Sequence, residues 1–179
     1  MRPANATIAA CLSFGSLVDC FQRRMAEQAY LLVPVVTNDQ WAAYHAIRRK
    51  VLFEDRGLFG KYNPNHADDR KAQNHPVILT CNGAPVGAMR IDLVPERAFA
   101  IMRTVAITTE KQRQGHGRIM LSLAETYALE NGCTAAVVFS ANDAIRFYGK
   151  YGYELETWDP TSSFGRGNQM KKVLSKQMR

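Results

Sequence analysis

Apolar residues recur at helical spacing in three stretches of the chain. The first stretch follows Thr37-Asn38-Asp39-Gln40, a capping-box pattern in which the outer two side chains bond each other's backbone N–H groups. The second ends at Asn131-Gly132 and the third before Gly152, and glycine suits the left-handed conformation at a helix end. The predicted helices cover about 38–53, about 118–130, and a segment that begins near Ser140 and ends at Tyr151.

Between these stretches, apolar runs bounded by turn residues predict strands. Asn82-Gly83 is the strongest short hairpin signal, and Pro95-Glu96-Arg97 makes the next turn, so three strands in series are expected to run antiparallel. The polar segment 54–76 is expected to be a long loop with one helical turn near 68–71. The predicted strands are 31–36, 77–81, 86–93, 98–108, 135–139, 153–158 and 169–175.

This order of elements predicts an α+β (mixed α/β) fold with a central, mostly antiparallel sheet of six to seven strands and about four helices. The chain has 179 residues, which favours one domain, expected over 31–179. Residues 1–30 are expected to form an N-terminal extension, because their apolar stretch is interrupted and makes a poor secretory signal. Met25 is an alternative biological start.

The net charge of +7 suits an anionic ligand, a nucleic acid or a membrane surface without choosing among them. No apolar run approaches the roughly 20 residues of a membrane span, and the composition excludes a channel, a coiled coil and a wholly disordered chain. The four cysteines form no C-x-x-C pair and no histidines cluster with them, so we expect no metal site and a reduced, cytoplasmic compartment.

The segment 105–118 combines features that bind phosphate. An apolar strand ends there, a loop with Gly115 and Gly117 follows, and a helix then begins. The start of a helix has N–H groups without partners and carries the positive end of the helix dipole, so both would act on an anion bound there. Arg113 and Arg118 add positive charge. The spacing matches neither the P-loop nor the G-x-G-x-x-G dinucleotide pattern, and a single G-x-G is also typical of a plain tight turn.

Two motifs together narrow the choice among the kinds of protein that contain such a loop. The segment Gln112-x-x-Gly115-x-Gly117 resembles the Q/R-x-x-G-x-G/A signature of the GNAT superfamily of acyl-CoA-dependent N-acetyltransferases. The segment from Asn142 through Phe147-Tyr148 to Gly152-Tyr153 resembles that family's second signature, a helix that ends in a glycine and an aromatic residue. The resemblance covers about 31–176 and implies a GNAT-like fold.

The resemblance also implies roles for individual residues. Tyr148 matches the tyrosine that protonates the departing CoA thiolate, and the N–H of Val105 or Ala106 would polarise the thioester carbonyl. Main-chain N–H groups from 114 to 118 would hold the pyrophosphate. The implied cofactor-binding residues are Val105, Ala106, Ile107, Gln112, Arg113, Gln114, Gly115, His116, Gly117, Arg118 and Asn142.

Four of these residues have plainer interpretations, which the sequence leaves open. Tyr148 suits a core aromatic, Asn142 a helix cap and Gln112 a solvated turn. The side chain of His116, between two loop glycines, is expected to face solvent rather than abstract a proton.

One part of the family pattern is missing. Many members place a glutamate on the central strand to accept the substrate's proton, but 98–104 contains no acid. Glu54 and Asp55, just after the first helix, are candidates for recruiting a cationic amine, with an exposed helix-end acid as the alternative for each. Arg103 is a candidate for selecting a substrate that bears a carboxylate. Glu54 and Arg103 are therefore the candidate substrate-binding residues.

The leading hypothesis is an N-acetyltransferase that transfers an acetyl group from acetyl-CoA to a primary amine of a small molecule or protein, without a metal. The amine would attack directly in a ternary complex, after entering between the loops 54–74 and 159–167. The oligomeric state stays open, a homodimer included.

Three alternatives remain. The missing glutamate favours a non-catalytic CoA-binding regulatory module, and a resemblance around 48–57 favours an acyl-homoserine-lactone synthase-like acyltransferase. The net charge and the basic tail suggest a nucleic-acid binder, but no interleaving of aromatic and basic residues supports it. We expect neither a nucleic acid nor a membrane as partner.

Overall fold

The structure is a computed structural model that describes residues 29–161 and 168–175. Its seven strands form one sheet in the order β1-β2-β3-β4-β5-β7-β6, in which only the β4–β5 pair is parallel. The strands are β1 (Tyr30–Pro34), β2 (Asn74–Cys81), β3 (Ala84–Val94), β4 (Phe99–Ile107), β5 (Ala135–Ser140), β6 (Glu154–Leu155) and β7 (Asn168–Val173). The expected mixed, mostly antiparallel sheet is confirmed.

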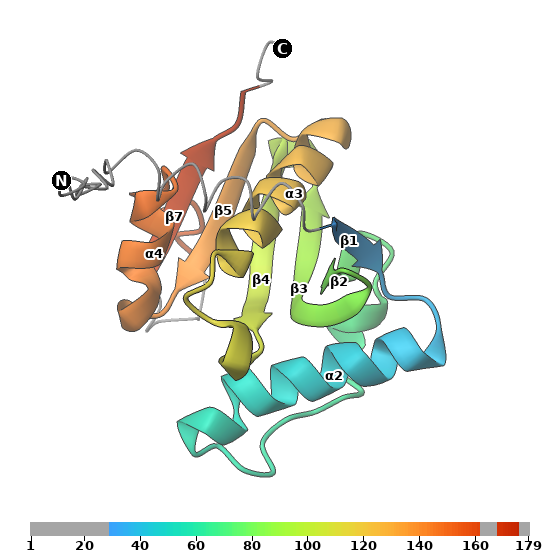
Figure 1. Ribbon diagram of the computed structural model, residues 1–179. Coiled ribbons are helices and arrows are strands. Elements are labelled where there is room, and N and C mark those ends of the chain that lie inside the picture. The colour runs from blue at the N-terminus through green and yellow to red at the C-terminus, as the bar shows by residue number, and fades with distance from the viewer. Residues whose placement is uncertain (1–28, 162–167, 176–179) are drawn as a thin grey trace, which may run out of the picture.

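Three α-helices lie within the described residues: α2 (Asn38–Leu52), α3 (His116–Glu130) and α4 (Ile145–Lys150). Figure 1 shows α3 across β3 and β4, and α4 beside β5 and β7. Short 3₁₀ turns, η1 (Glu54–Arg56), η2 (Ala67–Arg70), η3 (Pro95–Arg97), η4 (Thr109–Lys111) and η5 (Asn142–Ala144), occupy the connections. The expected number of about four helices is therefore slightly high for this part of the chain.

Alternating residues of the central strands pack against different helices, so the sheet is covered on both faces. Leu79 of β2 and Met89 of β3 belong to the core beneath α3 and α4. Ile78 and Ala88, each one residue away, belong to a second core beneath α2. The capping box at the start of α2 is confirmed, since the Thr37 hydroxyl accepts from the Gln40 N–H at 3.3 Å and the Gln40 side chain accepts from the Thr37 N–H at 2.8 Å.

Several predicted boundaries were wrong for local reasons. The strand expected at 153–158 is only Glu154–Leu155, because the backbone leaves the sheet and the N–H of Trp158 donates to the Gln169 side chain at 2.9 Å. Ser140 does not cap a helix, since it is the last residue of β5 and η5 precedes α4. The second strand starts at Asn74 rather than Val77 and therefore includes Pro76.

Some expectations fall outside the described residues. These are the N-terminal extension with its alternative start at Met25, Cys11 and Cys20, and most of the expected loop 159–167. Cys133 is buried among apolar residues, as expected, and both Cys81 and Cys133 are free thiols.

The β4–β5 pair separates part way along its length. The two strands are paired from Phe99 with Ala135 to Met102 with Val138, and β4 then continues to Ile107 paired with β3 but not with β5. On its other side β4 carries a bulge, where Thr104 and Val105 lie opposite the single residue Met89 of β3. Thr104 has a left-handed φ of 51°, and such a bulge bends its strand. The bend leaves the end of β4 without a strand partner on the β5 side.

A buried ionic network links α2 and η2 to the sheet. Asp69 of η2 accepts from the guanidinium groups of Arg48 at 2.7 Å and Arg90 at 2.8 Å. Arg90 also donates through Nε to Asp92 at 2.6 Å. Burial alone would raise the pKa of the Asp69 carboxyl, but the hydrogen bonds and charges of the two arginines lower it below its ordinary value.

We expect Asp69→Ala to reduce the free energy of unfolding by about 3–5 kcal/mol, because it leaves two buried guanidinium groups without their shared carboxylate. Urea unfolding measures the change, with Glu96→Ala on the exposed turn η3 as the control. Because folding lowers the pKa of Asp69, its stabilisation is present above about pH 4 and is lost as the pH falls through the folded value. Equal stability of the two variants would contradict the prediction.

Candidate active site

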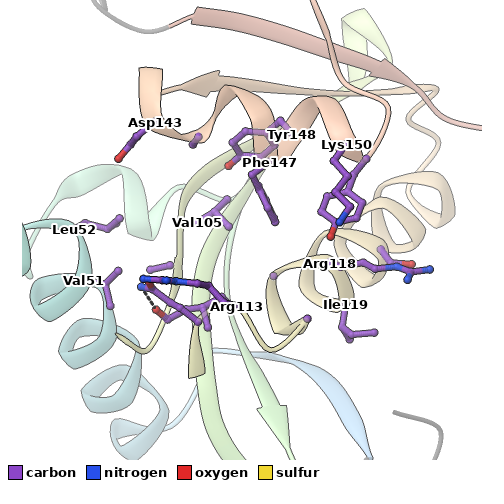
Figure 2. Close-up of a pocket in the computed structure, with 18 of the residues that line it drawn as sticks. Val51, Leu52, Val105, Arg113, Arg118, Ile119, Asp143, Phe147, Tyr148 and Lys150 are labelled. Carbon is purple, nitrogen blue, oxygen red and sulfur yellow. Dashed lines mark hydrogen bonds between the residues drawn. The ribbon is translucent and has the colours of Figure 1, made fainter. Parts of the chain in front are cut away.

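A groove of about 970 Å³ opens where β4 separates from β5. Its walls are the end of β4, the first turns of α3, the helix α4 and the C-terminal end of α2. Figure 2 shows Phe147 and Tyr148 of α4 facing Val105 of β4, with Val51 and Leu52 of α2 on the opposite side. The groove therefore connects the α4 side of the sheet with the side that α2 covers.

The loop before α3 holds its backbone open toward this groove. Gly115 has a left-handed φ of 91° and Arg113 one of 59°, so the chain reverses twice before the helix begins at His116. The Gln112 side chain donates to the Ile107 carbonyl at 3.0 Å, and the Gln114 side chain donates to the Glu110 carbonyl at 2.8 Å. These two bonds fix the loop. The Gln112 side chain is thus anchored to β4, although it is exposed.

The start of α3 is suited to an anion. The N–H of Ile119 donates to the Gly115 carbonyl at 3.2 Å and makes the first hydrogen bond within the helix. The N–H groups that come before Ile119 in the first turn therefore have no carbonyl partner within the helix. A side chain on Gly117 would press against Phe147, since an added Cβ would lie 3.1 Å from the Phe147 ring. A glycine here therefore keeps the floor of the groove open. The dipole of α3 adds partial positive charge at the same point.

The charged residues that line the groove are mostly basic. Four of the five charged residues that line it are basic: Arg56, Arg113, Arg118 and Lys150, with Asp143 as the acid. Figure 2 shows Arg118 and Lys150 at one end, far from Val51 and Leu52. The arrangement suits an elongated ligand with an anionic part and an apolar arm.

Tyr148 is a buried tyrosine whose ring also lines the groove. Burial raises the pKa of its hydroxyl to about 12, so it stays protonated at neutral pH. Its ring packs against Phe147 and Tyr153 with centroid distances of 5.2 and 5.5 Å. A fixed O–H donor therefore lies beside the end of β4, where that strand is no longer paired with β5.

The structure brings most of the predicted site residues together. Nine of them line the groove: Val105, Ala106, Ile107, Gln112, Arg113, Gly115, Gly117, Arg118 and Tyr148. The side chain of His116 instead points into the protein, where its Nδ1 lies 3.0 Å from the Tyr30 hydroxyl of β1. The expectation that it faces solvent was wrong, because it is only 4% exposed. Burial, followed by the charge of Lys111, lowers the pKa of His116.

Four other predicted residues do not line the groove. The Asn142 amide oxygen accepts from the Asn168 side chain at 2.8 Å, so it links η5 to β7. Glu54 is 3.6 Å from Arg49, and the Arg103 Nε donates to Asp92 at 3.2 Å. Gln114 is held by the backbone bond described above.

Sequence reasoning missed several lining residues. Arg56 lies in a turn-rich segment with no periodic pattern, and its partner across the groove, Asp143 at 3.7 Å, comes from a distant segment. Phe147 was named only within the second signature and without a role at the site, and Lys150, two residues after Tyr148, carried no separate signal.

Within residues 29–161 and 168–175, no three His, Cys, Asp or Glu side chains gather as a metal ion would require. In the same part of the chain, no helix combines the length and the apolar character needed to cross a bilayer.

Comparison with known proteins finds matches along most of this chain. The model of the acetyltransferase (GNAT) family matches residues 33–153. A solved protein assigned as an N-acetyltransferase, from Lactobacillus plantarum, is similar over 83% of this chain and 99% of its own, with 23% identity and a TM-score of 0.66.

Two further solved structures share the fold. The PaiA N-acetyltransferase from Thermoplasma acidophilum, solved in complex with coenzyme A, is similar over 82% of this chain and 99% of its own, with 12% identity and a TM-score of 0.64. The ribosomal-protein-S18-alanine N-acetyltransferase from Escherichia coli is similar over 84% of this chain and 99% of its own, with 16% identity and a TM-score of 0.59.

Proposed function

Because the chain belongs to the acetyltransferase (GNAT) family, we propose that it transfers an acetyl group from acetyl-CoA to a primary amine of a small molecule or protein. The transfer is a direct attack in a ternary complex. The observation that carries the proposal is the groove itself, which joins a helix start suited to an anion, a strand end that has separated from β5, and a buried tyrosine.

The part of the groove at the start of α3 holds the nucleotide half of acetyl-CoA. The diphosphate sits against the main-chain N–H groups between Gly115 and Arg118, where no side chain at Gly117 obstructs it. Arg113, Arg118 and Lys150 supply further positive charge. The coenzyme A complex of the Thermoplasma acidophilum protein, which has the same fold, supports this ligand.

The apolar part of the groove holds the pantetheine arm. Its amides bond to the free edge of β4, in the position that β5 occupies up to Val138. An N–H of Val105 or Ala106 then polarises the thioester carbonyl, and its hydrogen bond strengthens as the oxygen gains negative charge.

The chemistry proceeds by addition and elimination. The neutral amine nitrogen forms a bond to the thioester carbon, and the resulting oxyanion collapses as the carbon–sulfur bond breaks. The nitrogen loses its proton to water, and the sulfur leaves as a thiolate beside the Tyr148 hydroxyl. Because burial keeps the Tyr148 pKa near 12, the phenol hydrogen-bonds to the sulfur from the start of bond breaking and delivers a proton only once charge has developed there.

One observation favours a second candidate, a CoA-binding module without catalysis. The only acid among the described lining residues is Asp143, which faces Arg56 and is exposed, so no carboxylate in the described groove is placed as a general base. Acetyl-CoA binding without release of CoA in the presence of any amine would favour this candidate. We also propose a cytoplasmic location, which suits the free thiols of Cys81 and Cys133.

We expect Gly115→Ala to weaken coenzyme A binding about 5- to 30-fold, because an alanine resists the left-handed φ of 91° by about 1–2 kcal/mol and the loop relaxes away from its open form. Titration calorimetry measures the Kd. Gly149→Ala on α4 is the control, since no atom lies within 4 Å of its added Cβ. Equal Kd values for the two variants would contradict the proposed diphosphate site.

We expect Tyr148→Phe to reduce kcat about 100-fold or more while the Kd of acetyl-CoA changes less than about twofold, because only the O–H donor to the departing sulfur is lost. Tyr127→Phe is the control, on the same side of the sheet but packed against His75. CoA release measured with a thiol reagent gives kcat. An unchanged kcat would remove Tyr148 from the mechanism.

Below the pKa of the acceptor amine, kcat/KM is expected to rise about tenfold per pH unit, because only the neutral amine attacks and no protein base titrates first. The bend in the profile then follows the acceptor, near about 10.4 for an alkylamine and about 8 for an α-amino group. Profiles for one acceptor of each kind measure this. A bend at the same pH for both acceptors would reveal a base on the protein.

A further inference from the structure

The turn that begins α3 contains only one side chain. The segment Gly115-His116-Gly117 supplies main-chain N–H groups to the proposed diphosphate site, and His116 is its only residue that is not a glycine. Glycine leaves the backbone more freedom than any other residue, so the two glycines do little to fix the turn. The bonds of Gln112 and Gln114 described above fix the loop only as far as Gln114. The contacts of the His116 side chain therefore decide how firmly these N–H groups are held.

The His116 imidazole is fixed inside the protein. Its Nδ1 lies 3.0 Å from the Tyr30 hydroxyl, and the two rings are tilted by 59° with their centroids 5.6 Å apart. Because burial and the charge of Lys111 lower the pKa of His116, the ring is neutral at neutral pH. A neutral imidazole donates through one nitrogen and accepts through the other, and a hydroxyl can do both. Either tautomer of His116 can therefore keep this hydrogen bond.

Tyr30 belongs to a part of the sheet that is remote from the loop. It is the first residue of β1, directly opposite Cys81 of β2, and β1 is separated from β4 by two strands. Burial, together with the Cys81 thiol beside it, raises the pKa of the Tyr30 hydroxyl to about 12, so this hydroxyl keeps its proton at neutral pH. The start of α3 is thus held from two directions, by the loop that leaves β4 and by the edge strand β1.

The anchored imidazole affects the main chain on both sides of it. His116 is the first residue of α3, and the N–H groups of His116 and Gly117 belong to the peptide units on either side of the His116 Cα. Main-chain N–H groups bind an anion best when they already point at one place, because groups that must first be ordered lose conformational entropy on binding. A side chain tied to β1 keeps these two N–H groups ordered before the ligand arrives.

We propose that the hydrogen bond between Tyr30 and His116 positions the start of α3 for the diphosphate of coenzyme A. This inference rests on the proposed function, from which it takes the place of the diphosphate. Both residues act through the main chain of the turn, so they are positioning residues and do not touch the ligand with their side chains. His116 is then an internal anchor and not a base, since its ring bonds within the protein and does not line the groove.

Three variants test the proposal by titration calorimetry with coenzyme A, which requires no acceptor. Tyr30→Phe and His116→Leu each remove one partner of the bond and keep a side chain of similar size. Each is expected to raise the Kd about 3- to 10-fold, the factor typical of one hydrogen bond. The double variant is expected to raise the Kd no further than the weaker-binding single variant, because the second substitution removes nothing that the first has left.

A conservative variant and a matched control separate positioning from general damage. His116→Asn attaches an amide group to Cγ, as Nδ1 is attached, so it can keep the bond and is expected to bind coenzyme A within about twofold of the native Kd. Tyr127→Phe is the control, since the Tyr127 ring of α3 lies 5.6 Å from the His75 ring of β2, the same centroid distance as in the proposed pair. It is also expected to stay within about twofold. Urea unfolding verifies that each variant is folded.

Native Kd values in both Tyr30→Phe and His116→Leu would overturn this inference and leave the proposed diphosphate site standing. Losses that multiply in the double variant would overturn it too, since the two side chains would then act separately. So would a Kd of His116→Asn as high as that of His116→Leu. If His116→Leu failed to fold, the comparison of Tyr30→Phe with Tyr127→Phe would still decide the matter. Failure of the native chain to bind coenzyme A would instead overturn the proposed function.

Discussion

The parallel pairing of β4 with β5 lasts for only four residue pairs, and the site depends on where it stops. Burying a strand end without a partner costs free energy, because its N–H and carbonyl groups lose their hydrogen bonds to water and form no others. Here the bulge at Thr104 and Val105 bends β4 away while the bonds to β3 resume at Ala106. A ligand that carries amides of its own would satisfy the exposed strand edge, which is why we propose the gap as a binding site.

The two faces of the sheet then serve different purposes. On one face, α3 and α4 bring the anion-binding turn and Tyr148 to the gap, over a core of apolar residues. On the other, α2 and η2 cover an ionic layer in which Asp69 and Asp92 hold Arg48, Arg90 and Arg103. The two faces of the sheet therefore differ in polarity close to the same strand end. The fold is shared with proteins as different as an alanine N-acetyltransferase of a ribosomal protein, so side chains rather than topology must select the acceptor.

Features set by neighbouring residues could be predicted from the sequence, whereas those set by distant contacts could not. The capping box at Thr37, the hairpin at Asn82-Gly83 and the glycine loop before α3 are local, and the structure contains all three. The bulge in β4 left no signal in the sequence, because threonine is an ordinary strand residue. The left-handed φ of Thr104 is imposed by the surrounding sheet. His116 was placed in solvent because its partner, Tyr30, lies 86 residues earlier in the chain. The ionic layer was missed for the same reason, since η2, α2 and β3 each supply part of it.

A crystal structure of the protein with coenzyme A tests most directly whether the separation of β4 from β5 forms the donor site. The diphosphate should lie within hydrogen-bond distance of main-chain N–H groups between Gly115 and Arg118, the pantetheine amides should bond to β4 beyond Met102, and the sulfur should lie near the Tyr148 hydroxyl. Coenzyme A bound on another surface, with the gap between the strands empty, would contradict it.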